Sequence, residues 1–259
     1  MYTNKFTRIF MAMVIILLIS ALLALPAQAL MLVSRSQEVQ IGKTVEKDII
    51  RQNGGLSQDS VMVARVDRVG KTVAAKSPRK NIDYTYKVLN SDVINAYAAP
   101  GGPVLITKKL VQLLITDDEL AFVLAHETGH IAAEHGREAI NRSLVASGIA
   151  SILFRGASNT VQMGASIMYT LYNRGYSRSQ EYQADSYGLQ IMTGAGYKPA
   201  GAVKALAKLG IQRTGGVNKY LSTHPDVPDR IHRVAGLAGI SSEQEKALIQ
   251  QAQTEHSKK

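Results

Sequence analysis

The sequence predicts an α+β fold that is mostly helical, with one small antiparallel sheet beside the helix that carries the histidine motif. Two observations lead to this fold class. Segments with the alternating pattern of β-strands occur only in residues 82–107, whereas apolar residues elsewhere recur at helical spacing. Hydrophobic residues make up 46% of the chain and cysteine is absent, so a core rather than disulfides must hold the fold together.

Residues 1–29 have the features of a signal peptide. Lys5 and Arg8 precede an apolar stretch, and residues 27–29 form an A-x-A cleavage pattern. Because the apolar stretch approaches the length needed to span a bilayer, a retained N-terminal membrane anchor is the alternative. We expect cleavage, export to the periplasm or the medium, and one domain formed by residues 30–259.

The chain is basic, with a net charge of +10. A basic surface can favour anionic lipids or wall polymers, but scattered and solvated Lys and Arg are the simpler interpretation. No run of basic residues with interleaved aromatic side chains occurs, which argues against nucleic acid as a partner.

Helices and a small sheet are expected in the first part of the domain. Apolar spacing predicts helices over residues 36–53 and 59–77. The alternating segments that follow, expected as strands, are residues 82–89, 92–98 and 103–107. A Pro-Gly-Gly turn at residues 100–102 joins the last two. Pro103 favours an edge position for the third strand, because proline has no N–H to donate.

The rest of the chain is expected to be helical. Capping boxes, in which a Ser or Thr is followed three residues later by Glu or Gln, begin helices at Thr116 and at Ser177. The first of these is expected to run through AFVLAHETGHIAAEHGR and to end at Gly136. The other helices are expected at residues 108–115, from Asn141 onward, and at residues 199–209, 227–237 and 241–255.

An apolar segment, residues 144–172, is expected to form a helical hairpin. Its two halves are rich in small residues, and each is too short to span a membrane. It could cover a hydrophobic cleft as a lid, make peripheral contact with a membrane, or serve as ordinary core helix, which is the simplest interpretation. Its position between the two capped helices places it near any site that they form.

The sequence HETGH matches the H-E-x-x-H pattern of zinc hydrolases. On a helix, His126 and His130 lie about 40° apart around the axis, so both rings project from one face and can share one Zn²⁺. Glu127 follows the first histidine, where it can take a proton from the water that the metal activates. A helix with two solvated histidines is the alternative, since so short a pattern also arises by chance.

His135 does not extend this motif. In the longer pattern H-E-x-x-H-x-x-G-x-x-H, Ala133 would have to be Gly and Gly136 would have to be His. On a continued helix, His135 points about 140° away from His130. We therefore expect it to cap the helix C-terminus, where a cation is favoured, and we expect the third metal ligand to come from elsewhere.

The best candidate for the third ligand is Glu181, within SRSQEYQAD (177–185). A set of two histidines and one glutamate leaves the fourth zinc position open for water or substrate. Asp185, one helical turn later, can accept a hydrogen bond from the second nitrogen of a ligand histidine. Taken alone, both carboxylates would be ordinary surface residues.

A loop histidine, His224, lies within STHPDVPDRI (222–231). Such a histidine can donate a hydrogen bond to the oxyanion of a tetrahedral intermediate. Either Asp226 or Asp229 could orient its ring. A loop histidine without a role is the alternative.

Four motifs in this order resemble one family. NAYAAPGG (95–102), HETGH, SRSQEYQAD and STHPDVPDRI are similar to the HtpX and CAAX-prenyl-endopeptidase type of zinc metallopeptidase, and the resemblance spans residues 36–236. It implies a zincin-like fold of the gluzincin group with one Zn²⁺ per chain. The implied metal ligands are His126, His130 and Glu181, with Glu127 as general base and His224 as transition-state donor.

The resemblance also implies how a substrate binds. The strand around Asn95, Ala96 and Tyr97 would border the cleft and pair with the backbone of an extended peptide. HtpX and the prenyl endopeptidases span the membrane several times, whereas this sequence has no spanning segment after residue 29. It is therefore similar to the exported, soluble branch of the family.

These motifs lead us to expect a zinc metalloendopeptidase that hydrolyses peptide bonds in exported proteins, in envelope protein quality control. Unfolded or misassembled envelope proteins are the expected substrates, because pairing along an edge strand recognises extended backbone rather than side chains. One alternative is a periplasmic chaperone-like binding module with weak peptidase activity, against which the intact Glu127 argues. Another is a zinc hydrolase that acts on a non-peptide.

Overall fold

The computed structural model describes residue 13 and residues 32–147, 157–211 and 219–257. Apart from Met13, the predicted signal peptide lies outside the described residues, as do residues 148–156 of the predicted hairpin. Within the described part of the chain, no helix is both long enough and apolar enough to cross a bilayer.

The predicted elements occur in the predicted order with shifts at their ends, and the structure adds a short helix at residues 220–223 that was not predicted. The first part of the chain forms α2 (Arg35–Gln52), α3 (Ser60–Ala74), β1 (Thr85–Leu89), β2 (Ala96–Ala98), β3 (Pro103–Thr107) and α4 (Lys108–Leu113). The middle forms α5 (Asp117–Ala132), α6 (His135–Ala146), α8 (Ala157–Arg174) and α9 (Arg178–Gly194). The last part forms α10 (Ala200–Ile211), α11 (Tyr220–Thr223), α12 (Val227–Leu237) and α13 (Ser242–Ser257).

The sheet has three strands in the order β1-β3-β2, and it is mixed. β2 and β3 pair antiparallel across the turn at residues 100–102, as expected, but β1 pairs with β3 in parallel. The prediction of a purely antiparallel sheet is therefore wrong. The segment between β1 and β2 carries the chain past β3, so that β2 lies on the far side of β3 and β1 runs in the direction of β3.

The place of Pro103 also differs from the expectation, because β3 is the central strand and not an edge. Pro103 is tolerated there as the first residue of the strand, where no ladder N–H is required. Its carbonyl still accepts a hydrogen bond from the N–H of Ala99 at 2.8 Å. All residues of β3 are buried, which is typical of a strand covered on both faces.

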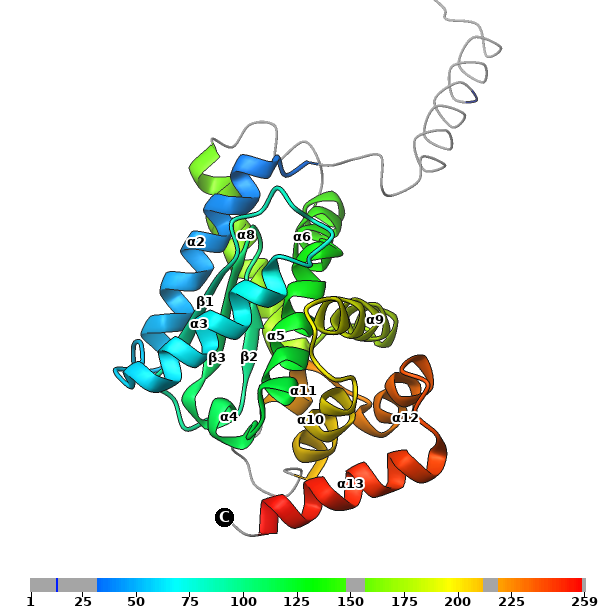
Figure 1. Cartoon of the computed structure of the whole chain (residues 1–259). Helices are drawn as coiled ribbons and strands as arrows, with labels where there is room; N and C mark the ends of the chain where they lie inside the picture. The colour runs from blue at the N-terminus through cyan, green and yellow to red at the C-terminus, as the bar shows by residue number, and fades with distance from the viewer. Residues whose placement is uncertain (1–12, 14–31, 148–156, 212–218, 258–259) are drawn as a thin grey trace, which may run out of the picture.

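Helices cover both faces of the sheet (Figure 1). Successive side chains of a strand point to opposite faces. In β3, Val104 and Ile106 pack with residues of α3 and α5, whereas Leu105 packs with residues of α2 and α8. The sheet is thus a thin layer between two helical layers, and α5 lies against one of its faces.

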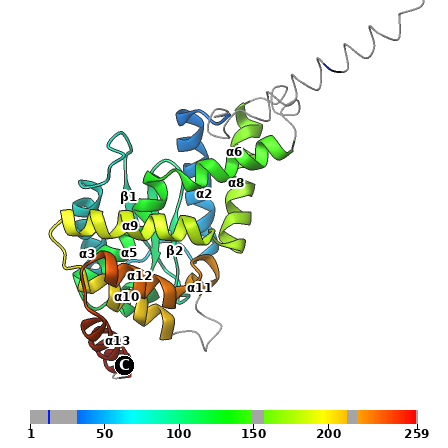
Figure 2. The ribbon, with the colours of Figure 1, turned by 90° about the vertical axis from the view of Figure 1, so that its right-hand side faces the viewer.

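Helix α5 begins where the sequence predicts. The side chain of Thr116 accepts a hydrogen bond from the N–H of Glu119, and the carboxylate of Glu119 accepts one from the N–H of Thr116. Glu119 is fully buried and also pairs with Lys208 of α10, with Nζ–O distances of 2.8 and 2.9 Å. The capping box therefore anchors the start of α5 to the C-terminal helices, which gather at one end of the molecule (Figure 2).

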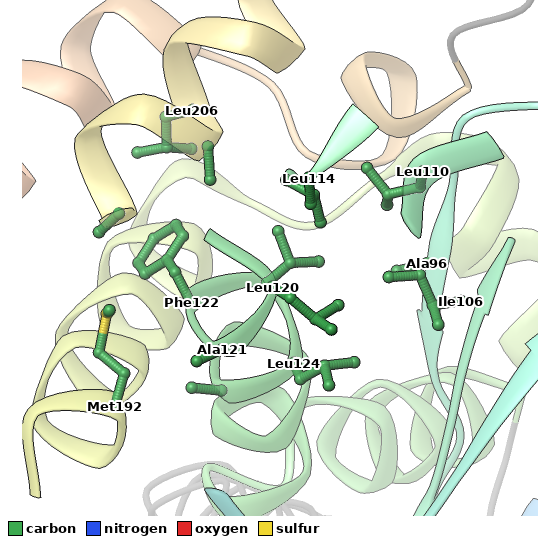
Figure 3. Packing of buried hydrophobic residues seen from close by; sticks show 14 of the residues in the cluster. Ala96, Ile106, Leu110, Leu114, Leu120, Ala121, Phe122, Leu124, Met192 and Leu206 are labelled. Atoms are coloured by element: carbon green, nitrogen blue, oxygen red, sulfur yellow. The ribbon is translucent and has the colours of Figure 1, made fainter. Parts of the chain in front are cut away.

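The rest of α5 passes through the core. Every residue from Glu119 to Ile131 is buried, including the polar residues of HETGH. Figure 3 shows Phe122 on the side of Met192 and Leu206, while Leu124 lies on the side of the strands. This packing holds the helix firmly just before the HETGH residues.

Candidate metal centre

Helices α5 and α9 cross with their backbones in close contact. A Cβ atom added to Gly129 of α5 would lie 3.0 Å from the carbonyl oxygen of Ala184, and one added to Gly188 of α9 would lie 3.2 Å from the Cα of His126. Larger side chains at the two glycines would press the helices apart. The close crossing brings the HETGH face of α5 directly opposite Glu181.

Four buried side chains meet at this crossing: His126, His130, Glu181 and His224. Each offers one ligand atom, and these atoms all lie within 4.8 Å of one another. The Nε2 atoms of His126 and His130 are 3.1 Å apart, and they lie 3.5 and 3.4 Å from the two oxygens of Glu181. Donors around a tetrahedral zinc ion are separated by about 3.3 Å, so this spacing fits zinc.

The charge states of these groups also suit a metal. Burial lowers the pKa of His130 well below its usual value, which keeps the ring neutral. Burial by itself would raise the pKa of Glu181, but the facing His224 and Arg230 outweigh burial and hold this pKa well below its usual range. A neutral imidazole and an ionised carboxylate are the forms that bind metal ions.

Glu127 lies beside the cluster and is fully buried. Neither of its carboxylate oxygens makes a hydrogen bond within the described residues. The nearest ring nitrogen, Nε2 of His224, is 3.5 Å from Oε1. Burial raises the pKa of Glu127, because an apolar surrounding disfavours the charged form. Glu127 is thus a buried carboxyl next to the donor cluster that has no hydrogen-bond partner in the described residues.

His224 follows the short helix α11, which the sequence did not reveal. Its ring stacks on Tyr220, with centroids 4.3 Å apart, and its Nδ1 lies 3.0 Å from Oε1 of Glu181 and 3.3 Å from Nε2 of His126. The position suits either a fourth metal donor or a hydrogen-bond donor next to the metal.

The prediction that Asp226 or Asp229 orients His224 is wrong. Asp226 pairs with Arg178 at 2.8 Å, and Asp229 is exposed. Asp226 has a left-handed backbone (φ 62°), and its carboxylate is held by Arg178. The carboxylates that face the ring are Glu181, on the Nδ1 side, and Glu127, on the Nε2 side.

Arg230, on α12, is a site residue that the sequence reasoning missed. It is fully buried; its Nε and Nη2 donate to Asp185 at 2.8 and 2.7 Å, and its Nη1 lies 2.8 Å from Oε2 of Glu181. The signal was present in the predicted amphipathic helix. Arg230 shares the buried face with Val227 and Ile231, where a charged residue needs an explanation.

Asp185 connects this arginine to the metal cluster. Its Oδ1 lies 3.0 Å from Nδ1 of His126, the nitrogen that faces away from the other donors. Burial alone would raise the pKa of Asp185, but Arg230 lowers it to about 2. The carboxylate is therefore ionised and can accept the N–H of His126.

His135 occupies a different position from the predicted one. Glu134 adopts a left-handed conformation (φ 59°), which ends α5 and lets a new helix begin at His135. The ring is buried, with Nδ1 2.9 Å from Nδ1 of His130 and Nε2 3.0 Å from Oε1 of Gln183. The prediction that the helix continues to Gly136, with His135 as its cap, is wrong because the left-handed residue Glu134 ends α5 and changes the direction of the chain.

In the predicted substrate strand, the N–H and C=O groups of Asn95, Ala96 and Tyr97 do not all face the same edge. Asn95 and Tyr97 pair with β3, so in an antiparallel ladder only Ala96 and Ala98 turn their N–H and C=O groups to the outer edge. The hydroxyl of Tyr172 donates to the carbonyl of Ala98 at 2.9 Å. For Ala96, no hydrogen bond across this edge occurs within the described residues.

Aromatic rings from the end of α8 and beyond cover the cluster. Tyr176 is buried and stacks on His130, with ring centroids 3.8 Å apart. Tyr172 lies near Tyr97 of the edge strand, with centroids 5.4 Å apart. Tyr172 is the last residue of the predicted hairpin, which thus reaches the edge strand, whereas Tyr176 lies beyond the hairpin.

The model of peptidase family M48 matches residues 62–238, a span that includes the whole donor cluster. The chain belongs to peptidase family M48. Zinc is the cofactor of M48 peptidases, and the buried donor cluster is able to hold it. The resemblance inferred from the four motifs, the zincin-like fold class and zinc as the cofactor are therefore confirmed.

Characterised M48 relatives include proteases from mitochondria and bacteria. The chain is 32% identical over 156 residues to the mitochondrial metalloendopeptidase OMA1 of Arabidopsis thaliana, covering 60% of this chain and 32% of the relative. It is 27% identical over 205 residues to the β-barrel assembly-enhancing protease of Yersinia pestis, covering 75% and 41%. It is 28% identical over 191 residues to metalloprotease YcaL of Escherichia coli, covering 67% and 71%.

The M48 chain spans only part of several of these relatives. It covers 32% of the plant OMA1 and 51% of OMA1 from Schizosaccharomyces pombe. The activity and substrates of the whole relatives therefore do not transfer to this chain.

Proposed function

We propose that this M48 chain is a zinc-dependent metalloendopeptidase that hydrolyses peptide bonds in exported proteins. The observation that carries the proposal is Glu127, a buried carboxylate without a hydrogen bond in the described residues, beside a cluster of zinc-compatible donors. Burying a polar group without a partner costs free energy. A structural role leaves that cost unexplained, whereas a general base needs a free carboxylate.

The arrangement supports the following mechanism. His126, His130 and Glu181 would hold the zinc, which when bound polarises the scissile carbonyl and makes the attacking water more acidic. Glu127 takes a proton from this water and passes it to the leaving amine.

His224 lies next to Glu127, with its Nε2 3.5 Å from Oε1 of that carboxylate. Burial alone would lower the pKa of His224, but the facing Glu181 and Glu127 raise it above its usual value. The protonated ring can donate to the oxyanion that develops on the substrate. Asp185 holds the ring of His126 through its Nδ1, which leaves Nε2 directed at the metal.

The outer edge of β2 supports an extended peptide as the substrate. Ala96 makes no hydrogen bond across this edge in the described residues but is buried, so its main-chain groups can pair with a substrate strand once the residues that cover it move aside, while Asn95 and Tyr97 shape the edge from within the sheet. The Tyr172 hydroxyl already donates a hydrogen bond to the carbonyl of Ala98. A substrate that pairs with this carbonyl must therefore displace the end of α8. The 144–172 segment would then act as a lid.

Unfolded or misassembled envelope proteins are the substrate class that we propose. Pairing with a strand edge requires extended chain, which folded proteins rarely offer. The name of one relative, a β-barrel assembly-enhancing protease, supports envelope proteins as the setting.

Replacement of Glu127 by Gln tests the proposed reaction. The amide keeps the shape but cannot accept the proton, so we expect cleavage of casein to fall by about 10²–10⁴-fold while zinc content stays at one ion per chain. Glu181→Ala is the matched variant, which should lose the zinc itself. A Glu127→Gln protein that still cleaves casein would contradict the proposal and favour a chaperone-like binding module.

The sequence of residues 1–29 supports export of the chain. We propose that this segment is a cleaved signal peptide, based on its basic start and its A-x-A pattern. N-terminal sequencing of the protein from an envelope fraction is the test. A start at Leu30 supports cleavage, whereas an intact Met1 in the membrane pellet shows that the segment remains an anchor.

A further inference from the structure

His130 is linked to the protein surface by two hydrogen bonds. Its Nδ1 lies 2.9 Å from Nδ1 of His135, and Nε2 of His135 lies 3.0 Å from Oε1 of Gln183. His135 is buried, with 2% of its surface exposed, whereas Gln183 is exposed on α9. The contacts therefore run from a buried ring at the metal centre to an amide in contact with solvent.

In each of the two contacts one atom must donate and the other accept, because one proton is shared between them. The inference rests on the proposed role of His130 as a zinc ligand through Nε2. That nitrogen gives its lone pair to the metal, so the proton of His130 sits on Nδ1, which can only donate. Nδ1 of His135 must then accept, and the proton of His135 sits on Nε2. This second N–H needs an acceptor, which is the oxygen of Gln183.

We propose that His135 and Gln183 are positioning residues that set the metal-binding tautomer of His130. The Gln183 amide, with its oxygen turned inward, holds His135 with its proton on Nε2. His135 in turn holds the proton of His130 on Nδ1 and leaves Nε2 free. A donor at position 183 would reverse both bonds and place a proton on the nitrogen that should bind zinc.

Substitutions at the exposed Gln183 test the direction of the bonds. Gln183→Glu offers only acceptors, and Gln183→Lys offers only donors. We expect the Glu variant to bind zinc at least as tightly as the wild type, and the Lys variant to bind about 10-fold more weakly or worse. The measurement is competition for zinc between a chelator and the purified full chain.

The added charge needs its own control. Ser179→Glu and Ser179→Lys place the same charges at an exposed position one turn earlier on α9. If zinc affinity responds to these variants as strongly as to the variants of Gln183, the effect is one of charge and the inference is overturned.

Substitutions of His135 separate the hydrogen bond from the packing. His135→Phe keeps a ring but leaves the N–H of His130 without an acceptor, so zinc affinity should fall about 10–100-fold. His135→Asn provides an oxygen near the position of Nδ1 and should restore most of the affinity. In this Asn background, Gln183→Lys should have no further effect, because the two side chains no longer touch. Equal losses in the Phe and Asn variants would overturn the inference.

Nitrogen NMR of the zinc-loaded wild type gives a direct signature. The imidazole ¹⁵N shifts of His135 should report a neutral ring with its proton on Nε2. A proton on Nδ1, or on both nitrogens, overturns the inference while leaving the zinc site intact. A wild-type protein that takes up no zinc overturns the proposed function, and the inference with it.

Discussion

The two histidines of HETGH are held by opposite kinds of surroundings. Nδ1 of His126 faces Asp185, which forms a fully buried ion pair with Arg230. Nδ1 of His130 faces the neutral ring of His135, whose contacts end at an exposed amide. One helix thus presents two equivalent side chains to the same site, but one is supported by charge in the core and the other by neutral groups that reach the surface.

This difference determines which substitutions each set of contacts can tolerate. The charges of the buried pair depend on each other, since removal of one leaves the other without solvent or partner. The neutral contacts from His130 through His135 end at the exposed Gln183, where water can replace a lost side chain. The His126 side should therefore control stability together with metal binding, and the His130 side should adjust metal binding alone.

The largest effect is expected for Arg230→Met. The substitution leaves Asp185 and Glu181 buried without their cation, so the free energy of unfolding should fall by about 3–5 kcal/mol. Urea unfolding of the metal-free protein measures it. Arg178→Met is the control, because Arg178 pairs with Asp226 but is 60% exposed, and its removal should change little. Similar losses of unfolding free energy in both variants would mean that the buried ion pair contributes no more to stability than the exposed one.

A second test asks whether the charged side also takes part in the chemistry. His224 faces Glu181, which Arg230 also contacts, and His224→Ala removes one oxyanion donor, which should lower kcat by about 10²–10³-fold. Zinc content should remain at one ion per chain, measured on the same preparation. Loss of zinc would instead identify His224 as a fourth ligand, and unchanged kcat and zinc content would leave it without a role.

The smallest effects compare the two sides directly. Asp185→Asn keeps an oxygen that can accept from His126 but removes the charge, and zinc affinity should fall by about 10–100-fold. Gln183→Leu removes the neutral acceptor of the other side, where water can take over, and the loss should stay below about 10-fold. Zinc competition titrations of the two variants decide the comparison. Equal losses would show that charge is not what distinguishes the two supports.

Local patterns in the sequence predict the helix starts, the spacing of the histidine motif and the family of this protein. The capping boxes at Thr116 and Ser177 begin helices where they predict, and both are present as reciprocal hydrogen bonds. The i, i+4 spacing of HETGH follows from the helix period alone. The order of the four motifs was enough to indicate the family. Each of these depends on residues only a few positions apart, or on a resemblance that carries the fold with it.

The tertiary structure decided what depends on distant parts of the chain. The crossing of α5 and α9 makes a site out of two separate helices, and the path of the chain past β3 makes β1 parallel to it. A single left-handed residue, Glu134, returns His135 to the ring of His130, although the helix period alone directs it away. Arg230 acquires its role only because α12 packs against α9. Sequence periodicity determines which face of a helix is apolar, but the partner of that face is set by contacts between segments far apart in the sequence.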